Sequence, residues 1–552
     1  MQRMRIRIGL VLLMVVGLAP GIFGEDRSES LRVGVGLKIR TLDPARASGT
    51  LSREIIGNTY DRLIEYDPGT PSSHYGLLAE SWTVSPDQQT FTFTLRVGPR
   101  FVSGDAVTAH DAAFSLRRMI RMRKSSPVPF RFLGWTAKMA ESLIQAQDTR
   151  TLVLKTTRPM APTLLLNALT MPMASVVQRD LVLKHEQQGD LGAKWLAQHH
   201  AGSGSFFWKA WSPKRFVLTR NPSYWNGVSV IGGVEFVQLP ESASRLKALQ
   251  QGEVQIARGL AVEEVSGLEK TGLVTQTVPR GAVYYLALNL ENPHLRKSKV
   301  RQALRRLVDY QGLQEHLEGQ VRMHPGFVPS GLLGALQQNG FGRDVARARQ
   351  LLADAKLRNG FSVRLDADHD FPFQTMARSI KAAFAQAKVA VKLVLDSGRN
   401  TLMRYKARQH DLYLGVWYPD YPDPHNNAIA FGYNPASNSQ PRSLPYRNNW
   451  ATPEAWSQRV LEGIRLADVV QRQQHYEELQ REHQVISPFI VLFENTETLA
   501  HSPEVAGLVF GSRPEHTLYQ FTYRPKKCRV WLKVRTALAM PCNVRGSIGM
   551  TS

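Results

Sequence analysis

Residues Leu77–Arg118, LLAESWTVSPDQQTFTFTLRVGPRFVSGDAVTAHDAAFSLRR, place a strand pattern and a helix pattern next to each other. Apolar side chains occupy every second position between Thr90 and Val97, which predicts a half-buried strand. One face of that strand would carry Phe91, Phe93, Leu95 and Val97. A helix is expected to begin at Thr108, with Asp111 in its first turn.

The same alternation of element types extends along the rest of the chain. A helix is expected from a cap at Ser52 to the stop at Asp67-Pro68, with these residues at helical spacing: Ile55, Ile56, Tyr60, Leu63 and Ile64. Strands are expected at Leu31–Val35 and Phe489–Phe493, the second of them following a long helix. Because helices and strands interleave throughout, the sequence predicts an α/β or α+β protein with mixed sheets.

Length and charge limit the possible classes of protein. A chain of 552 residues exceeds one ordinary domain, so two or more lobes are expected. The formal net charge of +23 raises the possibility of nucleic-acid binding. Residues 1–24 hold three arginines and residues 526–552 hold six basic residues, with no acid in either segment. Elsewhere the basic residues are scattered among acidic ones, which favours a solvated surface and no nucleic-acid partner.

The first 24 residues have the layout of a secretory signal peptide, with a positive start, an apolar run from Ile8 to Gly17 and small residues near Gly24. No cysteine follows the apolar run, so the protein is expected to be exported to the periplasm without a lipid anchor. The two cysteines, Cys528 and Cys542, lie in the basic tail, where an exported protein could join them in a disulfide. By themselves they would make an incomplete metal site.

Motifs of catalysis and of cofactor binding are missing from the sequence. It has no phosphate-binding loop of the Gly-x-x-x-x-Gly-Lys-Ser/Thr type and no His-Glu-x-x-His zinc helix. The glycines of GSGSF, from Gly202, lack the spacing of a nucleophile elbow. We therefore expect neither an enzyme nor a bound metal or cofactor, although carboxylates from distant positions could act together without a local motif.

Several segments, read in order, resemble one family: the peptide- and nickel-type extracytoplasmic solute-binding proteins of ABC transporters, family 5. Residues 77–118 resemble the family signature, and the similar segments further along are GSGSFFWKAWSPKRFVLTRNPSYW, ALQQGEVQIA, LALNLENPHLRKSKVRQALRRLVD and ARARQLLADA. The resemblance extends from Leu31 to Tyr523. Two departures stand out: Ser205 follows Gly204 where the family has proline, and Gln255 replaces the usual aspartate.

The resemblance implies a two-lobed periplasmic-binding-protein fold of the class II type, with an extra subdomain in lobe I. We expect lobe I at residues 25–66, 202–273 and 489–525, the subdomain at 67–201 and lobe II at 274–488. Two crossing strands, near Val274–Leu288 and Val485–Phe493, would join the lobes. The resemblance also implies that the protein is a monomer that closes on a peptide and delivers it to a membrane permease, without making or breaking a bond.

The stretch GVWYPDYPDP, Gly415–Pro424, holds the main candidate residues of the site. In the family, an aspartate in this loop binds the peptide amine, which by position is Asp420. Trp417, Tyr418 and Tyr421 are the expected pocket walls, and Asp423, between two prolines, is expected to be structural. The alternative is that Asp420 is only a turn residue and that the aromatic residues belong to the core. Ser48 and Thr50, after the first strand, are further candidates, with helix capping as their alternative role.

A second acidic segment bears on the choice of ligand. Dipeptide-binding members place an arginine near the loop DADHDFPFQ, Asp366–Gln374, to hold the peptide carboxylate. Here the loop has three acids, and Arg378 follows it. We infer a longer peptide, a cationic peptide or a non-peptide amine. Other possibilities are a nickel chelate, haem, an opine or a sugar in the same fold, an exported hydrolase, or a charged adhesin.

Overall fold

The structure is a computed structural model that describes residues 30–36, 39–67, 70–122, 130, 132–317, 320–337, 342–435 and 443–523. The expected signal peptide and the basic tail with Cys528 and Cys542 lie outside the described residues. The class is α/β with mixed sheets, as predicted. Among the described residues, no helix is both long enough and apolar enough to cross a membrane.

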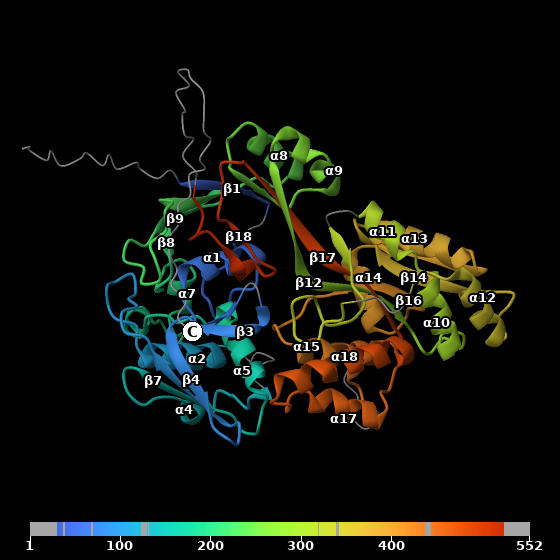
Figure 1. Cartoon of the computed structure of the whole chain (residues 1–552), viewed down its shortest axis with the longest axis horizontal. Helices are drawn as coiled ribbons and strands as arrows, with labels where there is room; N and C mark the ends of the chain where they lie inside the picture. Colours follow the sequence, from blue (N-terminus) through green and yellow to red (C-terminus); the bar gives the residue numbers. More distant parts are fainter. Residues whose placement is uncertain are drawn as a thin grey trace, which may run out of the picture.

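Eleven strands form one mixed sheet that runs through both halves of the molecule (Figure 1). Ten of them follow one another in the order β15 (Val389–Asp396), β14 (Phe361–Asp368), β16 (Leu412–Trp417), β12 (Val274–Leu288), β17 (Phe489–His501), β11 (Ile256–Arg258), β1 (Leu31–Val35), β10 (Gly233–Gln238), β9 (Arg215–Arg220) and β8 (Phe206–Ser212). The eleventh, β13 (Val321–Met323), pairs with β17.

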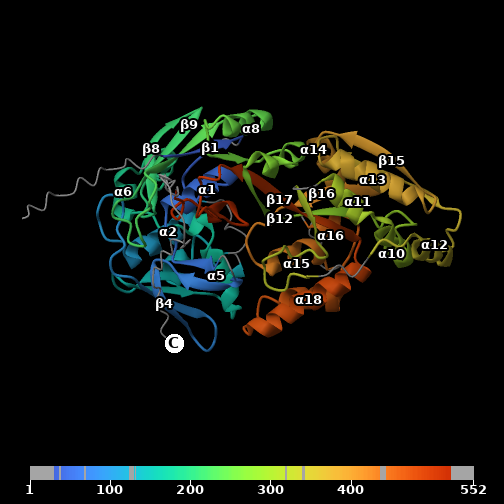
Figure 2. The ribbon, with the colours of Figure 1, turned by 45° about the horizontal axis from the view of Figure 1, so that its top comes forward.

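Two long antiparallel strands, β12 and β17, join the two lobes (Figures 1 and 2). Their pairing is interrupted between Pro279 and Val283, and Gly281 in this interval has a φ of +75°, a conformation that glycine adopts at little cost. The two-lobed fold implied by the family resemblance is therefore confirmed. The exact lobe boundaries given above stay predictions.

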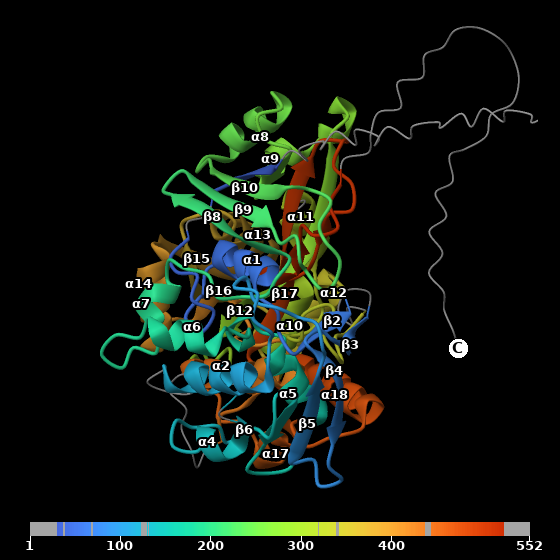
Figure 3. The same cartoon turned by 90° about the vertical axis from the view of Figure 1, so that its left-hand side faces the viewer.

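The first lobe carries its own small sheet below the large one (Figure 3). Its strands follow the order β4 (Ala79–Val84), β5 (Thr90–Leu95), β7 (Thr151–Lys155) and β6 (Ile144–Ala146). We call the part of the first lobe built around this sheet the subdomain. It includes the helices α2 (Ala109–Arg121), α4 (Ala140–Leu143), α5 (Pro162–Leu169) and α6 (Arg179–Lys184) and the 3₁₀ turn η1 (Pro172–Ala174).

The strand and helix predicted within residues 77–118 are both present. On β5, Phe91, Phe93 and Leu95 are buried as expected. The expectation for Val97 is wrong: its side chain is 81% exposed, because the strand ends at Leu95. Helix α2 begins after Thr108, whose side chain and that of Asp111 form a reciprocal capping box.

The helix expected from Ser52 differs from the structure at both ends. Helix α1 (Thr50–Thr59) is capped by the backbone of Gly49, so Ser52 lies inside it and does not cap it. It ends at Thr59, whereas Leu63 lies in a bend and Ile64 opens strand β2 (Ile64–Asp67). The chain leaves the helix because Asp61 is held by Ser203, Tyr224 and Trp225, far along the sequence, at 2.9, 2.9 and 3.2 Å.

Several small elements complete the first lobe. Strand β3 (Thr70–Gly76) pairs with β2, and β18 (Val509–Phe510) pairs with β19 (Thr517–Leu518). The remaining elements are α7 (Ala193–Leu196), α8 (Ser242–Gln250), α9 (Val262–Val265), and the 3₁₀ turns η2 (Leu268–Thr271) and η3 (Pro514–His516). The loop that contains η3 follows β17 back into the first lobe.

Helices surround the other end of the large sheet to form the second lobe (Figures 1 and 2). They are α10 (Ser298–Leu307), α11 (Tyr310–His316), α12 (Val345–Asp354), α13 (Phe373–Ala385), α14 (Gly398–Lys406), α15 (Pro424–Gly432), α16 (Leu444–Arg447), α17 (Glu454–Glu462) and α18 (Val469–Ile486). Two buried apolar clusters cover this part of the sheet, one under α10 to α13 and one under α15 to α18.

The burial of Glu494, on β17 between the lobes, should make the stability of the protein depend on pH. The Glu494 side chain is fully buried, and this burial raises its pKa from 4.5 to about 7, although Ser330 and Arg322 act to lower it. Between these two pH values the folded protein binds more protons than the unfolded chain, so stability falls as pH rises. In Glu494→Gln, the free energy of unfolding should therefore decrease with rising pH by about 1–3 kcal/mol less than in the unsubstituted protein.

Urea unfolding of both proteins at pH 5 and pH 8 measures the effect. The difference in the free energy of unfolding between the two pH values should be smaller in the variant. Other titrating groups are common to both proteins and cancel in this comparison. An equal pH dependence in the two proteins would show that Glu494 titrates normally in the folded state.

Candidate functional site

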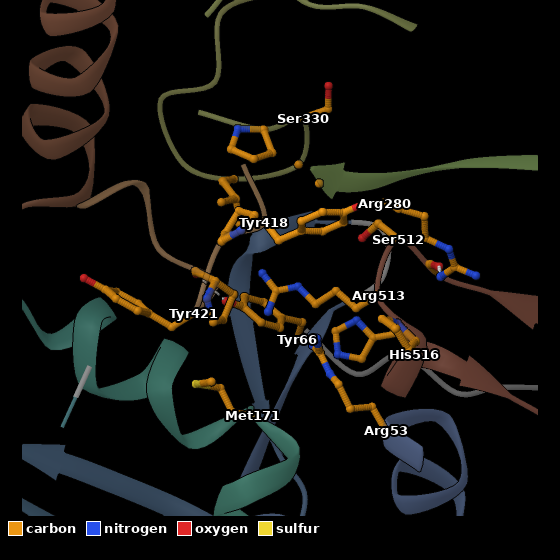
Figure 4. Close-up of a pocket in the computed structure, with 18 of the residues that line it drawn as sticks. Arg53, Tyr66, Met171, Arg280, Ser330, Tyr418, Tyr421, Ser512, Arg513 and His516 are labelled. Atoms are coloured by element: carbon orange, nitrogen blue, oxygen red, sulfur yellow. Dashed lines mark hydrogen bonds between the residues drawn. The ribbon is translucent and has the colours of Figure 1, made fainter. Parts of the chain in front are cut away.

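A cavity of about 160 Å³ lies between the two lobes, beside the crossing strands (Figure 4). The second lobe contributes residues Pro329 to Leu332 and Tyr418 to Pro422, and β12 contributes Arg280 and Gly281. The first lobe contributes Arg53, Tyr66, Met171, Gly511, Ser512, Arg513, Pro514 and His516. A molecule bound here would contact both lobes and the strands that join them.

The loop after β16 brings Asp420 to this cavity. Its prolines have fixed φ angles, which limit the freedom of the loop. With its side-chain oxygen turned toward the loop, Asn426 of α15 accepts hydrogen bonds from the backbone N–H groups of Asp420 and Tyr421 at 3.1 and 3.0 Å. The Asp420 side chain is exposed, and Tyr418 beside it is 63% exposed. Both residues are therefore accessible to a ligand in the cavity.

Tyr421 lines the cavity, but its ring is buried in the apolar core of the subdomain. Its side chain is 2% exposed and is part of the apolar core of the subdomain. Figure 4 shows the ring of Tyr421 pointing away from Tyr418 and Arg513. The next residue, Pro422, accepts a hydrogen bond from the Tyr66 hydroxyl at 2.9 Å. This side of the loop is thus attached to the first lobe.

Asp423 caps α15 and forms a buried ion pair. Its carboxylate accepts from the backbone N–H of His425 at 2.9 Å and from the Arg472 guanidinium at 2.7 and 3.0 Å. Asn167 of the subdomain also donates to it, at 2.7 Å. Burial alone would raise the pKa of Asp423, but Arg472 and the hydrogen bonds hold it below its usual value. These contacts fit the structural role expected for Asp423.

The first-lobe side of the cavity is rich in paired charges. Arg53 on α1 donates to Glu515 at 2.7 Å, and His516 lies 3.0 Å from Glu65. Burial would raise the pKa of Glu515, but the positive charges around it, Arg53 first, lower it to about 2. On the crossing strands, Arg280 donates to Glu497 at 2.8 Å.

The remaining candidate residues do not line the cavity. Trp417 is the last residue of β16, and its ring packs at 6.4 Å from that of Phe431. Ser48 is exposed in the loop before α1, and Thr50 is the first residue of that helix. The structure therefore brings together Asp420, Tyr418 and Tyr421 at the cavity, and places Trp417, Ser48 and Thr50 outside it.

The acids of the segment from Asp366 also lie outside the cavity. Asp366 is fully buried and pairs with Arg364 and Arg404 at 2.8 and 2.6 Å. Asp368, His369 and Asp370 offer atoms within 4.8 Å of one another that could hold a cation, but two of the three are exposed on the surface. They add no negative charge to the wall of the cavity.

Sequence reasoning missed the first-lobe wall, above all Tyr66 and Arg513. Tyr66 lies in a segment that was expected to be helical. Arg513 follows Gly511 and Ser512 and precedes Pro514, a run of turn-forming residues after the last crossing strand. Such a turn next to a crossing strand is a signal that could have identified the loop as a candidate wall.

Comparison with known proteins gives consistent matches. Residues 74–439, more than half of the chain, match a family model described as "Bacterial extracellular solute-binding proteins, family 5 Middle". The probable D,D-dipeptide-binding periplasmic protein DdpA of Escherichia coli K12 is 27% identical over 493 residues, 87% of this chain and 92% of that protein. The glutathione-binding protein GsiB of Salmonella paratyphi A is 25% identical over 395 residues, covering 70% and 74% of the two chains.

Solved structures resemble this one over most of its length. HbpA2 from Haemophilus parasuis has a TM-score of 0.77 at 20% identity, with 90% of this chain and 100% of that chain covered. DppA from Helicobacter pylori, in complex with the peptide STSA, has a TM-score of 0.69 at 23% identity, with 90% and 98% covered. At these identities the likeness shows a shared fold.

Proposed function

The chain belongs to the bacterial extracellular solute-binding proteins of family 5, the substrate-binding proteins of ABC importers, and we propose that it captures short peptides in the cavity between its lobes. The observation that carries the proposal is the exposed carboxylate of Asp420 in the wall of that cavity. An ammonium group cannot be withdrawn from water without a charged partner, and a fixed carboxylate provides one.

The matched relatives support a peptide ligand. DdpA is named for D,D-dipeptides and GsiB for glutathione, and both kinds of ligand carry a free amine and a free carboxylate. The exposed ring of Tyr418 next to Asp420 offers an apolar surface to a side chain. Space left around the ligand can be filled by water, which adapts to different side chains.

The crossing strands supply a means of closure. Gly281 interrupts the pairing of β12 with β17 and also lines the cavity. A rotation of the lobes about this interruption would change the size of the cavity, so a ligand that contacts both lobes would favour the closed arrangement. A membrane permease would then recognise the closed form. In this proposal the protein is exported by residues 1–24, carries no lipid anchor and catalyses no reaction.

Native mass spectrometry of the purified protein, followed by titration calorimetry, tests the proposal. We expect a co-purified peptide, and saturable binding by at least one of L-Ala-L-Ala, D-Ala-D-Ala, glutathione and tetra-alanine. Co-purification of an opine, a sugar, haem or a metal chelate, together with no binding of these peptides, would contradict it. Turnover of a bound peptide would contradict the assignment of a binding protein.

A further inference from the structure

The positive side chains around the cavity differ in whether a carboxylate forms an ion pair with them. Among the described residues that line the cavity, four can be positive, namely Arg53, Arg280, Arg513 and His516. Three of these form an ion pair with a carboxylate: Arg53 pairs with Glu515, Arg280 with Glu497, and His516 with Glu65. Within the part of the chain that the structure describes, no carboxylate forms an ion pair with Arg513.

Arg513 is held in position by an aromatic ring instead. The carbon of its guanidinium group lies 5.0 Å from the centre of the Tyr66 ring, a cation–π contact that leaves the N–H groups available. Its backbone carbonyl accepts from the N–H of His516 at 3.0 Å, which fixes the turn that carries it. Figure 4 shows Arg513 between Tyr66 of the first lobe and Tyr418 of the second.

A half-buried guanidinium group without a carboxylate favours an anionic ligand. Withdrawal of such a charge from water is costly unless it is paired and hydrogen-bonded. The planar guanidinium group offers two parallel N–H donors that match a carboxylate. Asp420, which belongs to the opposite lobe, is the only acidic side chain among the lining residues that the structure describes.

We propose that Arg513 binds the carboxylate of the ligand and that the protein therefore selects zwitterionic ligands, with the amine at Asp420 and the carboxylate at Arg513. This inference rests on the proposed function, since it assigns the second end of the same peptide. In this assignment Arg513, from the first lobe, takes the role of the arginine expected near Asp366–Gln374 in the second lobe. A ligand with both charges would be contacted by both lobes, so each charge would favour closure.

Titration calorimetry on the full chain tests the assignment, with each of the four peptides named above and with its C-terminal amide. The unsubstituted protein should bind the peptide with a free C-terminal carboxylate about 10- to 100-fold more tightly than its amide. In Arg513→Gln this preference should disappear, through loss of affinity for the carboxylate form. Arg513→Lys should retain part of it, because the charge remains but the paired donors do not.

Arg399→Gln is the matched control, since Arg399 is an exposed arginine of α14 that does not line the cavity. Its preference for the carboxylate should equal that of the unsubstituted protein. Arg513 also helps to lower the pKa of Glu515, so a purely structural role is the competing explanation. In that case Arg513→Gln would reduce thermal stability and leave the preference for the carboxylate unchanged, which would overturn the assignment.

The two proposals can fail separately. If peptides bind and the preference survives in Arg513→Gln, only the role of Arg513 is wrong. If no peptide of the panel binds to the unsubstituted protein, peptide capture is wrong and the assignment falls with it.

Discussion

Replacing Asp420 by asparagine is expected to weaken the binding of free-amine peptides by about 10- to 100-fold, because the peptide ammonium loses its charged partner. Asparagine has nearly the same size, and the exposed position of Asp420 means that the fold should be unaffected. Titration calorimetry with L-Ala-L-Ala and N-acetyl-L-Ala-L-Ala measures the effect. The unsubstituted protein should prefer the free amine, and the variant should bind both forms about equally weakly.

The control is Asp370→Asn, at an exposed acid of the second lobe outside the cavity. It changes the net charge by the same amount, so it should reproduce any general electrostatic effect and nothing more. If Asp420→Asn retained full affinity for the free amine, Asp420 would be a turn residue and the amine would bind elsewhere. If both aspartate variants lost the same affinity, long-range charge would explain the result.

Replacing Asp423 by asparagine should reduce the free energy of unfolding by about 3–5 kcal/mol, because it leaves the charge of Arg472 buried and uncompensated. Both side chains are fully buried. The substitution also weakens the contact with Asn167 of the subdomain. Urea unfolding monitored by circular dichroism measures the loss, and it should be seen in the absence of any ligand.

The same substitution at another helix start provides the control. Asp344 caps α12 through the backbone N–H of Arg347, at 2.8 Å, and is exposed. Asparagine caps helices about as well as aspartate, so Asp344→Asn should change stability by less than about 1 kcal/mol. Adding Arg472→Met to Asp423→Asn should recover part of the loss, since it removes the uncompensated charge. Equal effects at Asp423 and Asp344 would show that capping alone matters.

Residues 77–118 show how much local pattern can predict. The alternation from Thr90 predicted β5, and Thr108 with Asp111 predicted the capped start of α2, because each element satisfies its own backbone within a short segment. The class of fold followed from the interleaving of such elements. The helix from Ser52 failed beyond Thr59, where contacts from distant residues hold Asp61.

The candidate site divides in the same way. The loop with Asp420 could be identified because its prolines, tyrosines and acids are contiguous in the chain. Which side chains face the cavity could not, because the burial of Tyr421 depends on contact with the subdomain. Nor could Arg513, whose relation to Tyr66 joins residues more than 400 positions apart.

The sequence by itself determined elements such as β5 and α2, the family and the loop that carries Asp420, since these depend on local spacing and on the order of segments along the chain. Only the tertiary structure decided the opposite wall. Compensation of charge depends on distance in space: Arg53, Arg280 and His516 are paired with carboxylates, whereas Arg513 has an aromatic ring beside it. That difference, which no local pattern records, is the basis for assigning the carboxylate end of the ligand.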